Sequence, residues 1–301
     1  MSVLAITGGT GFVGSCLIEL ALAAGHRVRA LTRRAQPARD GIEWVPGSLD
    51  DAAALQALAT GADAVIHVAG VVNAPTRDGF ARGNIDGTAA MLAAAQAAGV
   101  NRFVHVSSLA AREPRLSTYG WSKAEAEALV TAAPLDWTIV RPPAIFGPGD
   151  REMLELFRMA RWGLALLPSA GRLSVIEVSE LGRLLLALAA THDCRTILEV
   201  DDGRPGGWTH REFAHALGAA VGRRVLALRV PRPLLMATAW ADRRVRGDRA
   251  KLTPDRVDYF CHPDWVVDPA RRVPAQMWQP TLDTHAALAR TAAWYRANGL
   301  L

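Results

Sequence analysis

The sequence is poor in cysteine. Its 301 residues include three, Cys16, Cys194 and Cys261, which are far apart and show no C-x-x-C spacing. An odd number of separate cysteines argues against a disulfide framework and against a zinc site, so a reducing compartment is expected. The histidines of the second half also lack ligand spacing, and no metal site is predicted. They are His192, His210, His215, His262 and His285.

Long apolar runs are missing too. No uninterrupted stretch reaches the ~18 residues that a membrane-spanning helix needs. The N-terminus has no basic region before its apolar residues, as a secretory signal would, and continues directly into a β-branched run. We therefore expect a cytoplasmic protein, with peripheral contact to the inner membrane left open.

Acidic residues are the minority: 34 Lys and Arg against 29 Asp and Glu give a net charge of +5. The excess gathers in residues 223–249, where arginines are mixed with Leu, Met and Trp. This stretch is either a solvated, salt-bridged surface or an amphipathic surface that meets an anionic membrane or a lipid substrate. No nucleic-acid recognition motif accompanies the charge, so nucleic-acid binding is not expected.

Short β-branched runs alternate with alanine-rich stretches over the first two-thirds of the chain. This alternation predicts an α/β fold, a doubly wound parallel sheet of the Rossmann type. The expected strands are 3–7, 27–32, 43–47, 63–70, 102–108 and 136–143, and the expected helices are 14–25, 51–59, 84–99 and the segment around 118–124. Beyond about residue 150 the pattern becomes irregular. We expect a coenzyme-binding domain over 1–165 and a smaller, mixed substrate-binding part over 166–301 that covers the carboxyl edge of the sheet, with some elements returning to the first core.

A glycine-rich loop, "TGGTGFVG", lies between the first strand and the first helix. Gly8 allows a tight turn, Gly11 lets the backbone approach a pyrophosphate, and Gly14 lets helix and strand pack closely. The helix N-terminus would offer its free N–H groups to the anion. The loop, including Thr10, Phe12 and Val13, is therefore predicted to bind a dinucleotide; a purely structural loop is the alternative.

The second strand lacks the acid that would hold the ribose 2′-hydroxyl of NAD. It ends in Thr32, Arg33 and Arg34, and the first carboxylate is Asp40. A guanidinium suits a 2′-phosphate, so we predict NADP(H), bound chiefly through Arg33 and also through Arg34. A solvated basic turn is the alternative.

Tyr119 and Lys123, in "TYGWSKA", form a Tyr-x-x-x-Lys pair that decides nothing alone, because i,i+4 neighbours are common on helices. The wider pattern is more specific. The glycine loop, "GSLDD", "HVAG", "NIDGT", "VSS", "YGWSK", "RPPAIFGPGD" and the C-terminal "WQPTLDTHAALARTAAWYRANG" follow one another in that order. Over nearly its whole length the chain thereby resembles the extended short-chain dehydrogenase/reductases of the NAD-dependent epimerase/dehydratase family. It is most similar to the branch with the NADPH-binding accessory subunit of complex I and bacterial ceramide reductases.

The resemblance implies a catalytic triad. Tyr119 would be the general acid–base, Lys123 would lower its pKa and hold the nicotinamide ribose, and Ser108, rather than Ser107, would hold the substrate oxygen. Further coenzyme contacts are implied at Leu49, Ala69, Gly70, Pro142 and Ile145. Ser48 departs from the family, which usually has an aspartate there near the adenine.

Other residues receive structural interpretations. His67 and His105 lie on predicted buried strands and are expected to be satisfied core histidines. Asn84 is expected to cap a helix, with a structural role near the edge of the active site as the alternative. Residues 156–168 and 234–241 are expected to form core and lid helices or to line an apolar substrate channel.

The resulting functional hypothesis is an NADPH-dependent reductase of a 3-oxo group on a hydrophobic substrate, such as a sphingolipid or ceramide precursor. Two alternatives stay open: a nucleotide-sugar epimerase or dehydratase, and a non-catalytic NADPH-binding assembly subunit. The expected partner is a small molecule, and the sequence does not decide between a monomer and a homodimer.

Overall fold

The computed structural model describes residues 1–168, 170–247 and 253–301, and the chain forms two compact units. The first unit comprises Met1–Arg141, Leu181–Glu199 and Val273–Trp278, and the second comprises Pro142–Glu180, Val200–Arg272 and Gln279–Leu301. The first stretch of the first unit ends at Arg141, where the chain leaves the large sheet after its sixth strand.

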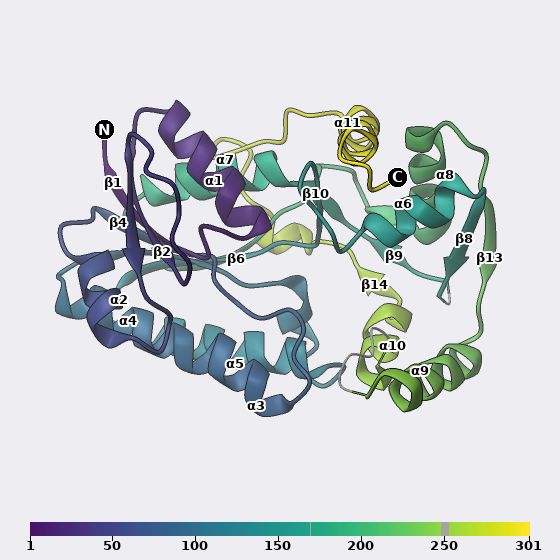
Figure 1. Ribbon diagram of the computed structural model, residues 1–301, viewed down its shortest axis with the longest axis horizontal. Coiled ribbons are helices and arrows are strands. Elements are labelled where there is room, and N and C mark those ends of the chain that lie inside the picture. The colour runs from purple at the N-terminus through teal and green to yellow at the C-terminus, as the bar shows by residue number, and fades with distance from the viewer. Residues whose placement is uncertain (169, 248–252) are drawn as a thin grey trace. The chain divides into compact units, whose positions relative to one another are not determined.

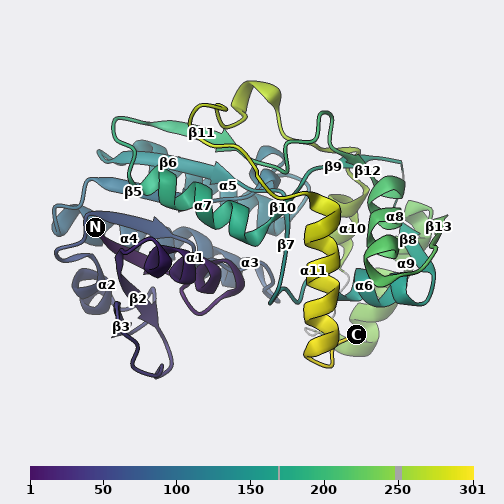
Figure 2. The ribbon, with the colours of Figure 1, turned by 90° about the horizontal axis from the view of Figure 1, so that it is seen from above.

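Seven parallel strands form the sheet of the first unit (Figures 1 and 2). In spatial order they are β11 (Thr196–Glu199), β6 (Asp136–Arg141), β5 (Arg102–Val106), β4 (Ala64–His67), β1 (Val3–Thr7), β2 (Arg27–Thr32) and β3 (Ile42–Pro46). Every residue of β4 and β5 is buried, as expected of strands covered on both faces. The predicted doubly wound Rossmann sheet is confirmed. Its strand order reverses between β1 and β4, and ligands of this fold bind at such a switch point.

Helices cover both faces of this sheet (Figure 1). One face carries α1 (Phe12–Ala23) and α7 (Val178–Ala189), and the other carries α2 (Ala52–Ala59), α4 (Gly87–Ala97) and α5 (Thr118–Ala132). Between β4 and α4 lie a short helix α3 (Arg77–Phe80) and a π-helical turn (Ala81–Asp86). The core of the second face is formed by fully buried side chains, among them Leu55, Leu58, Met91 and Phe103.

The second unit contains three small sheets and five helices within the described residues. The sheets pair β10 (Val175–Glu177) with β7 (Ala144–Phe146), β9 (Arg172–Leu173) with β12 (Trp208–Thr209) and β14 (Asp264–Trp265), and β8 (Leu164–Leu167) with β13 (Leu226–Arg229). The helices are α6 (Leu154–Arg161), α8 (His210–Val221), α9 (Arg232–Arg246), α10 (Pro254–Cys261) and α11 (Thr284–Ala297). Its core joins α6, α8 and α11, and Tyr295 meets Phe157 edge to face at 5.1 Å.

One of the two helix predictions in this unit is wrong. Residues 156–168 do not form one helix: α6 ends at Arg161, and the chain turns at Gly163, whose φ of +73° leaves the helical region, into β8. Residues 234–241 lie in a helix, α9, as predicted; Ala239 is the only buried residue that α9 contains, so α9 is not a core helix, and its role as a lid stays a prediction. No helix in the described part of the chain is long and apolar enough to cross a membrane.

Candidate active site

The glycine loop follows β1 and leads into α1. Gly8 has a φ of +72°, and a Cβ atom built on it would lie 2.8 Å from the backbone nitrogen of Ala69. A Cβ at Gly14 would lie 2.1 Å from the carbonyl oxygen of Gly8, so only glycine permits this contact between helix and loop. Gly11 caps α1 without a side chain, and the first turn of α1 holds no acidic residue. The N–H groups of that turn therefore face an anion without competition, as a pyrophosphate requires.

The other predicted residues of the loop lie around this helix start. Thr10 is exposed, and Phe12 and Val13 are partly buried in the first turn of α1. Thr10 precedes the N-cap Gly11 and so lies beside the same N–H groups. The loop and the switch point of the sheet together fit a dinucleotide.

Thr7, the last residue of β1, is linked to the end of β4. Its hydroxyl accepts a hydrogen bond from the Ala69 backbone N–H (3.1 Å) and is bonded to His67 Nδ1 (2.8 Å). His67 Nε2 lies 3.2 Å from the Thr88 hydroxyl, which donates its proton to the Asn84 carbonyl. Thr88 must therefore accept from His67, which places the His67 proton on Nε2. Burial, with a smaller effect of Lys123, lowers the pKa of His67 to about 3, so the predicted satisfied core histidine is confirmed.

His105, on β5, stacks on His67 with 5.5 Å between ring centroids. It is equally buried, and burial, then Lys123 and His67, hold its pKa well below the ordinary value. Neither of its ring nitrogens has a hydrogen-bond partner within the described residues. The core position was predicted correctly, but the expectation that its hydrogen bonds are satisfied is wrong.

Asn84 does not cap a helix, because it lies inside the π-helical turn rather than at a helix start. Its side chain is almost fully buried, accepts from Val71 N (2.6 Å), and donates to Val71 O (2.9 Å) and to the Ser122 hydroxyl (2.8 Å). These bonds connect the segment after β4 to α5, which is the structural role held as the alternative. A Cβ at Gly70 would lie 3.0 Å from Asn84 Oδ1 and 3.1 Å from Lys123 Nζ, so Gly70 borders the same site.

Ser108 and Tyr119 are brought together by two local caps. Ser108 caps a 3-10 turn (Leu109–Arg112) by accepting from Ala110 N at 3.2 Å, and Ser117 caps α5 through Gly120 N at 3.0 Å. A Cβ at Gly120 would lie 2.7 Å from Ala110 O, so glycine lets the start of α5 approach that turn. The side chains of Ser108 and Tyr119 are hydrogen-bonded to each other.

The pKa of Tyr119 differs from the expectation. Burial of the phenol raises it, and the hydrogen bond from Ser108 lowers it by less. Lys123 does not acidify the phenol here. Its ammonium donates to the Val106 carbonyl (3.0 Å), and burial lowers the pKa of Lys123 to about 8 against the opposing charge of Glu127. Tyr119 therefore keeps its proton at neutral pH, which is the state that a proton donor needs.

A buried ionic network lies beside Lys123 and was missed by the sequence analysis. Glu127, one turn along α5, accepts from the Ser107 hydroxyl (2.5 Å) and from two nitrogens of Arg141 (2.8 and 2.6 Å). Arg141 also lies 3.5 Å from Glu199, which accepts from Arg112 at 3.2 Å. Ser107 is thus engaged with Glu127, and Ser108 is the serine bonded to Tyr119. The spacing of Glu127, four residues after Lys123, was the available signal.

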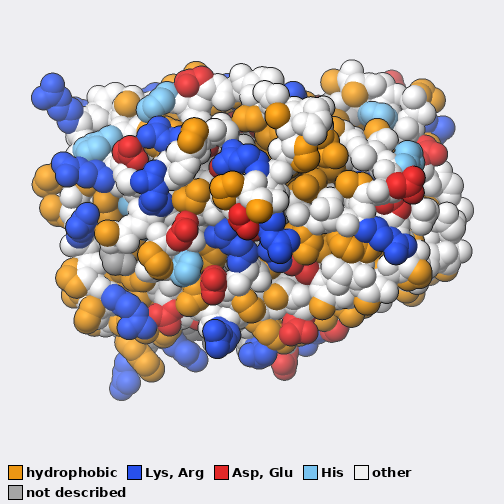
Figure 3. Space-filling model, turned by 180° about the vertical axis from the view of Figure 1, so that it is seen from behind, with side chains coloured by type: hydrophobic (Ala, Val, Ile, Leu, Met, Phe, Trp, Pro, Cys, Tyr) orange, Lys and Arg blue, Asp and Glu red, His pale blue; other side chains and the backbone are white. Residues whose placement is uncertain are grey.

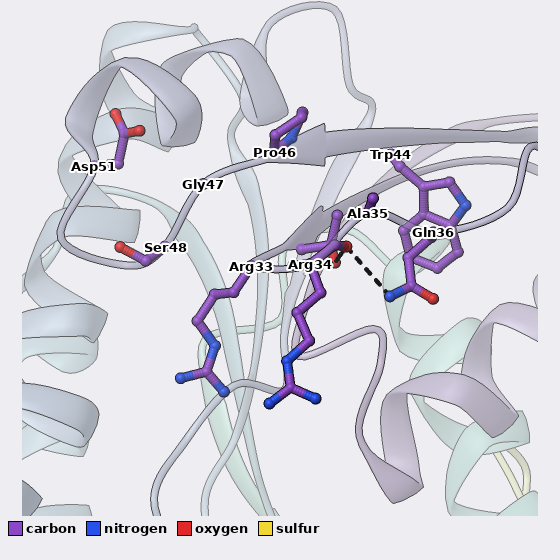
Figure 4. A pocket seen from close by; sticks show the side chains of 10 residues that line it. Arg33, Arg34, Ala35, Gln36, Trp44, Pro46, Gly47, Ser48 and Asp51 are labelled. Atoms are coloured by element: carbon purple, nitrogen blue, oxygen red, sulfur yellow. Dashed lines mark hydrogen bonds between the residues drawn. The ribbon is translucent and has the colours of Figure 1, made fainter.

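Arg33 and Arg34 line a hollow of about 500 Å³ at the ends of β2 and β3 (Figure 4). Their guanidinium groups extend side by side, both exposed, and neither forms an ion pair with a described residue. Ser48 and Asp51 lie on the opposite wall, but Asp51 caps α2 through Ala54 N (3.0 Å). The wall formed by Arg33 and Arg34 therefore presents two cations to a ligand, and neither is paired with a described residue.

Three further residues were predicted to contact the coenzyme: Leu49, Pro142 and Ile145. Leu49 packs against Gly87, where a Cβ would lie 2.6 Å from its Cδ1. Pro142 and Ile145 belong to the second unit, in which Ile145 lies on β7. Among the described residues no group of three or more His, Cys, Asp or Glu side chains is arranged to hold a metal ion.

Comparison with known proteins agrees with this geometry. Residues 8–154 match a family model described as NAD(P)H-binding. The chain is 39% identical to a ceramide reductase of Caulobacter vibrioides, over 99% of this chain and 96% of the relative. It is 30% identical to a 2-alkyl-3-oxoalkanoate reductase of Stenotrophomonas maltophilia, over 89% and 92% of the two chains. Among solved structures, a human epimerase family protein with NADPH superimposes with a TM-score of 0.76 at 22% identity, over 97% and 99% of the chains.

These relatives settle the class to which the protein belongs. The chain is an NAD(P)-dependent oxidoreductase, and it is a member of the extended short-chain dehydrogenase/reductases of the epimerase/dehydratase type.

Proposed function

We propose that this enzyme reduces a 3-oxo group on a hydrophobic, lipid-like substrate such as a sphingolipid or ceramide precursor, with NADPH as the reductant. The observation that carries the proposal is the hydrogen bond between Ser108 and a Tyr119 phenol that remains protonated. Two relatives named as reductases of a ceramide and of a 3-oxoalkanoate support the choice of a ketone.

In the proposed reaction the coenzyme, when bound, supplies a hydride to the carbonyl carbon. Ser108 holds the carbonyl oxygen by a hydrogen bond, and Tyr119 transfers its phenolic proton to that oxygen, giving a secondary alcohol. Lys123 holds the ribose hydroxyls next to the nicotinamide. Its ammonium already lies beside Gly70, at the end of β4.

The preference for NADPH rests on Arg33 and Arg34, whose exposed guanidinium groups suit a 2′-phosphate. Gly8, Thr10, Gly11, Phe12 and Val13 would hold the pyrophosphate. Leu49, Ala69, Pro142 and Ile145 would complete the contacts with adenine and nicotinamide. We assign substrate selection to the second unit, and we place the reaction in the cytoplasm, which suits three cysteines that form no disulfide.

Incubating the purified chain with NADPH or NADH and a panel of long-chain 3-keto lipids, sterol ketones and UDP-sugars, followed by mass spectrometry, tests the proposal. Reduction of a 3-keto lipid is expected. Conversion of a UDP-sugar would favour an epimerase or dehydratase instead, and no turnover of any compound would favour an assembly subunit. Tyr119→Phe should abolish turnover and leave NADPH binding nearly unchanged; retained turnover would remove Tyr119 from the mechanism.

The coenzyme preference has its own test. Arg33→Ala and Arg34→Ala should each raise the Kd for NADPH about tenfold or more, in nicotinamide fluorescence titrations, and leave the Kd for NADH unchanged. Arg39→Ala is the matched control, because Arg39 pairs with Glu19 and does not line the hollow. Tighter binding of NADH than NADPH by the unmodified chain would contradict the assignment.

A further inference from the structure

Helix α9 turns an apolar face to solvent. Leu234, Trp240 and Val245 are 57%, 62% and 84% exposed. Leu234, Ala237, Ala241 and Val245 follow the i, i+3, i+7, i+11 spacing of one helix face, and all four are exposed. The helix packs through the opposite face, where Ala239 is fully buried and Leu235 and Met236 are partly buried. An exposed apolar stripe of this length on a 15-residue helix calls for a binding partner.

The apolar surface continues onto the strand that leads into α9. Leu226 and Leu228 on β13 are 62% and 43% exposed, and Leu228 pairs in register with Leu166 on β8, which is 46% exposed. Only Val230 and Pro231 separate β13 from α9. Leu226 and Leu228 therefore lie on one continuous segment of chain with the stripe on α9.

Arginines surround this segment. Arg232 pairs with Asp258 (2.6 Å) and Arg246 with Asp242 (3.3 Å). Arg229, Arg243 and Arg244 are exposed, and no ion pair joins any of them to another residue in the described ranges. Figure 3 shows hydrophobic and basic side chains next to one another at its lower left, over α9. The local charge left after pairing is positive.

We propose that this surface binds the anionic face of a lipid bilayer, with α9 lying in the plane of the headgroups. The α9 surface consists of Leu234, Ala237, Trp240, Ala241 and Val245 together with Arg229 and Arg244. Aliphatic side chains with a tryptophan enter the interface, and long arginine side chains reach the phosphates from its border. The basic stretch noted in the sequence thus contributes Arg229 and Arg244 to the border of this surface; its last two residues, 248 and 249, lie outside the described residues.

The charge pattern favours lipid over a second copy of the chain. Two α9 surfaces packed against each other would bring two positively charged borders together, and like charges repel. A membrane with anionic lipids attracts each arginine near its surface, in addition to burying the apolar stripe. The proposal does not depend on the reaction that the enzyme catalyses.

The test is flotation of the full chain with vesicles, of phosphatidylcholine alone or mixed with phosphatidylglycerol. The chain is expected to float with the mixed vesicles and not with the neutral ones. Leu234→Glu with Val245→Glu, and separately Arg229→Glu with Arg244→Glu, should each reduce the bound fraction about tenfold or more. Arg211→Glu, a charge reversal at an exposed position of α8, should leave it unchanged. Far-ultraviolet circular dichroism and NADPH binding verify that each variant is folded.

Three results would overturn the proposal. The first is that the unmodified chain floats with neither kind of vesicle. The second is that both α9 variants float as the unmodified chain does. Alternatively, light scattering without lipid would show a dimer that the Leu234→Glu, Val245→Glu variant dissociates, so that a second copy covers the surface. Reduction of a short, water-soluble 3-oxo compound is measured in parallel. Loss of flotation with intact reduction, or the reverse, separates this proposal from the proposed function.

Discussion

The charge of Glu127 is predicted to keep Lys123 protonated at the pH where the enzyme works. Burial lowers the pKa of Lys123 to about 8, and Glu127, one turn away on α5, opposes that effect. Replacing the carboxylate by an amide of the same shape, Glu127→Gln, removes the charge and keeps the volume. The pKa of Lys123 should fall, and the alkaline limb of the pH–rate profile should move to lower pH.

The size of the shift follows from the geometry. Side chains four residues apart on a helix are about 6 Å apart, and unit charges at that distance interact by ~3 kcal/mol at an effective dielectric constant of about 20. That energy corresponds to ~2 pKa units. Arg141, bonded to Glu127 at 2.6 and 2.8 Å, cancels part of its field, so we expect a net fall of about one unit, to a pKa of ~7.

The assay is kcat/KM for NADPH-dependent reduction between pH 6 and pH 9. A fall of one unit reduces the protonated fraction of Lys123 about fivefold at pH 8 and by only about a tenth at pH 6. Glu125→Gln is the matched control, since Glu125 is exposed on the same helix. An equal loss at both pH values would mean that Glu127 acts only by supporting the fold, and an unmoved alkaline limb would refute the electrostatic reasoning.

Three further predictions concern stability. The pKa of His67 is about 3 in the folded chain, against an ordinary value of 6.5, so the unfolded chain binds more protons below pH 6.5. The free energy of unfolding should therefore fall by up to ~5 kcal/mol as the pH drops towards 3. His67→Gln should reduce this pH dependence in urea unfolding at pH 7 and pH 5, and an unchanged dependence would refute the assignment. Arg102 is 2% exposed and pairs with the buried Asp136 at 3.3 Å, so Arg102→Met should cost ~3–5 kcal/mol in urea unfolding, and a loss below about 1 kcal/mol would contradict this. Gly14→Ala places a methyl group 2.1 Å from Gly8 O, so it should lower the free energy of unfolding by ~1–3 kcal/mol and weaken the binding of NADPH. Tight NADPH binding by this variant would show that the loop can move.

Local rules were sufficient for the sheet and the phosphate loop. Strands, helices and glycines that must approach a backbone leave direct traces in the sequence, and the parallel sheet and the demands on Gly8 and Gly14 appear as predicted. The failures depend on tertiary surroundings. From the sequence, Asn84 was expected to cap the N-terminus of a helix. The chain instead forms a π-helical turn that contains it, and its side chain is hydrogen-bonded to Val71 and Ser122. Segment 234–241 forms the predicted helix, but hydrophobicity alone does not say whether its apolar side chains meet protein.

The electrostatics of Tyr119 show the same limit most clearly. The i,i+4 spacing correctly placed Lys123 near the site but not the direction of its hydrogen bond, which goes to Val106 O. Burial then dominates both groups, raising the pKa of Tyr119 and lowering that of Lys123. Neither effect can be estimated without knowing how deeply each side chain lies.

The choice of lysine at position 123 follows from this burial. The chain uses arginine almost everywhere for positive charge: of its 34 basic residues, only Lys123 and Lys251 are lysines. An arginine at position 123 would stay charged and would bring five N–H donors into a site where the structure offers the Val106 carbonyl as acceptor. An ammonium needs fewer partners, and its remaining N–H groups stay available for the ribose hydroxyls of a coenzyme. Glu127, held in place by Ser107 and Arg141, then acts as a fixed counter-charge that helps to keep this one small cation protonated near neutral pH without bonding to it.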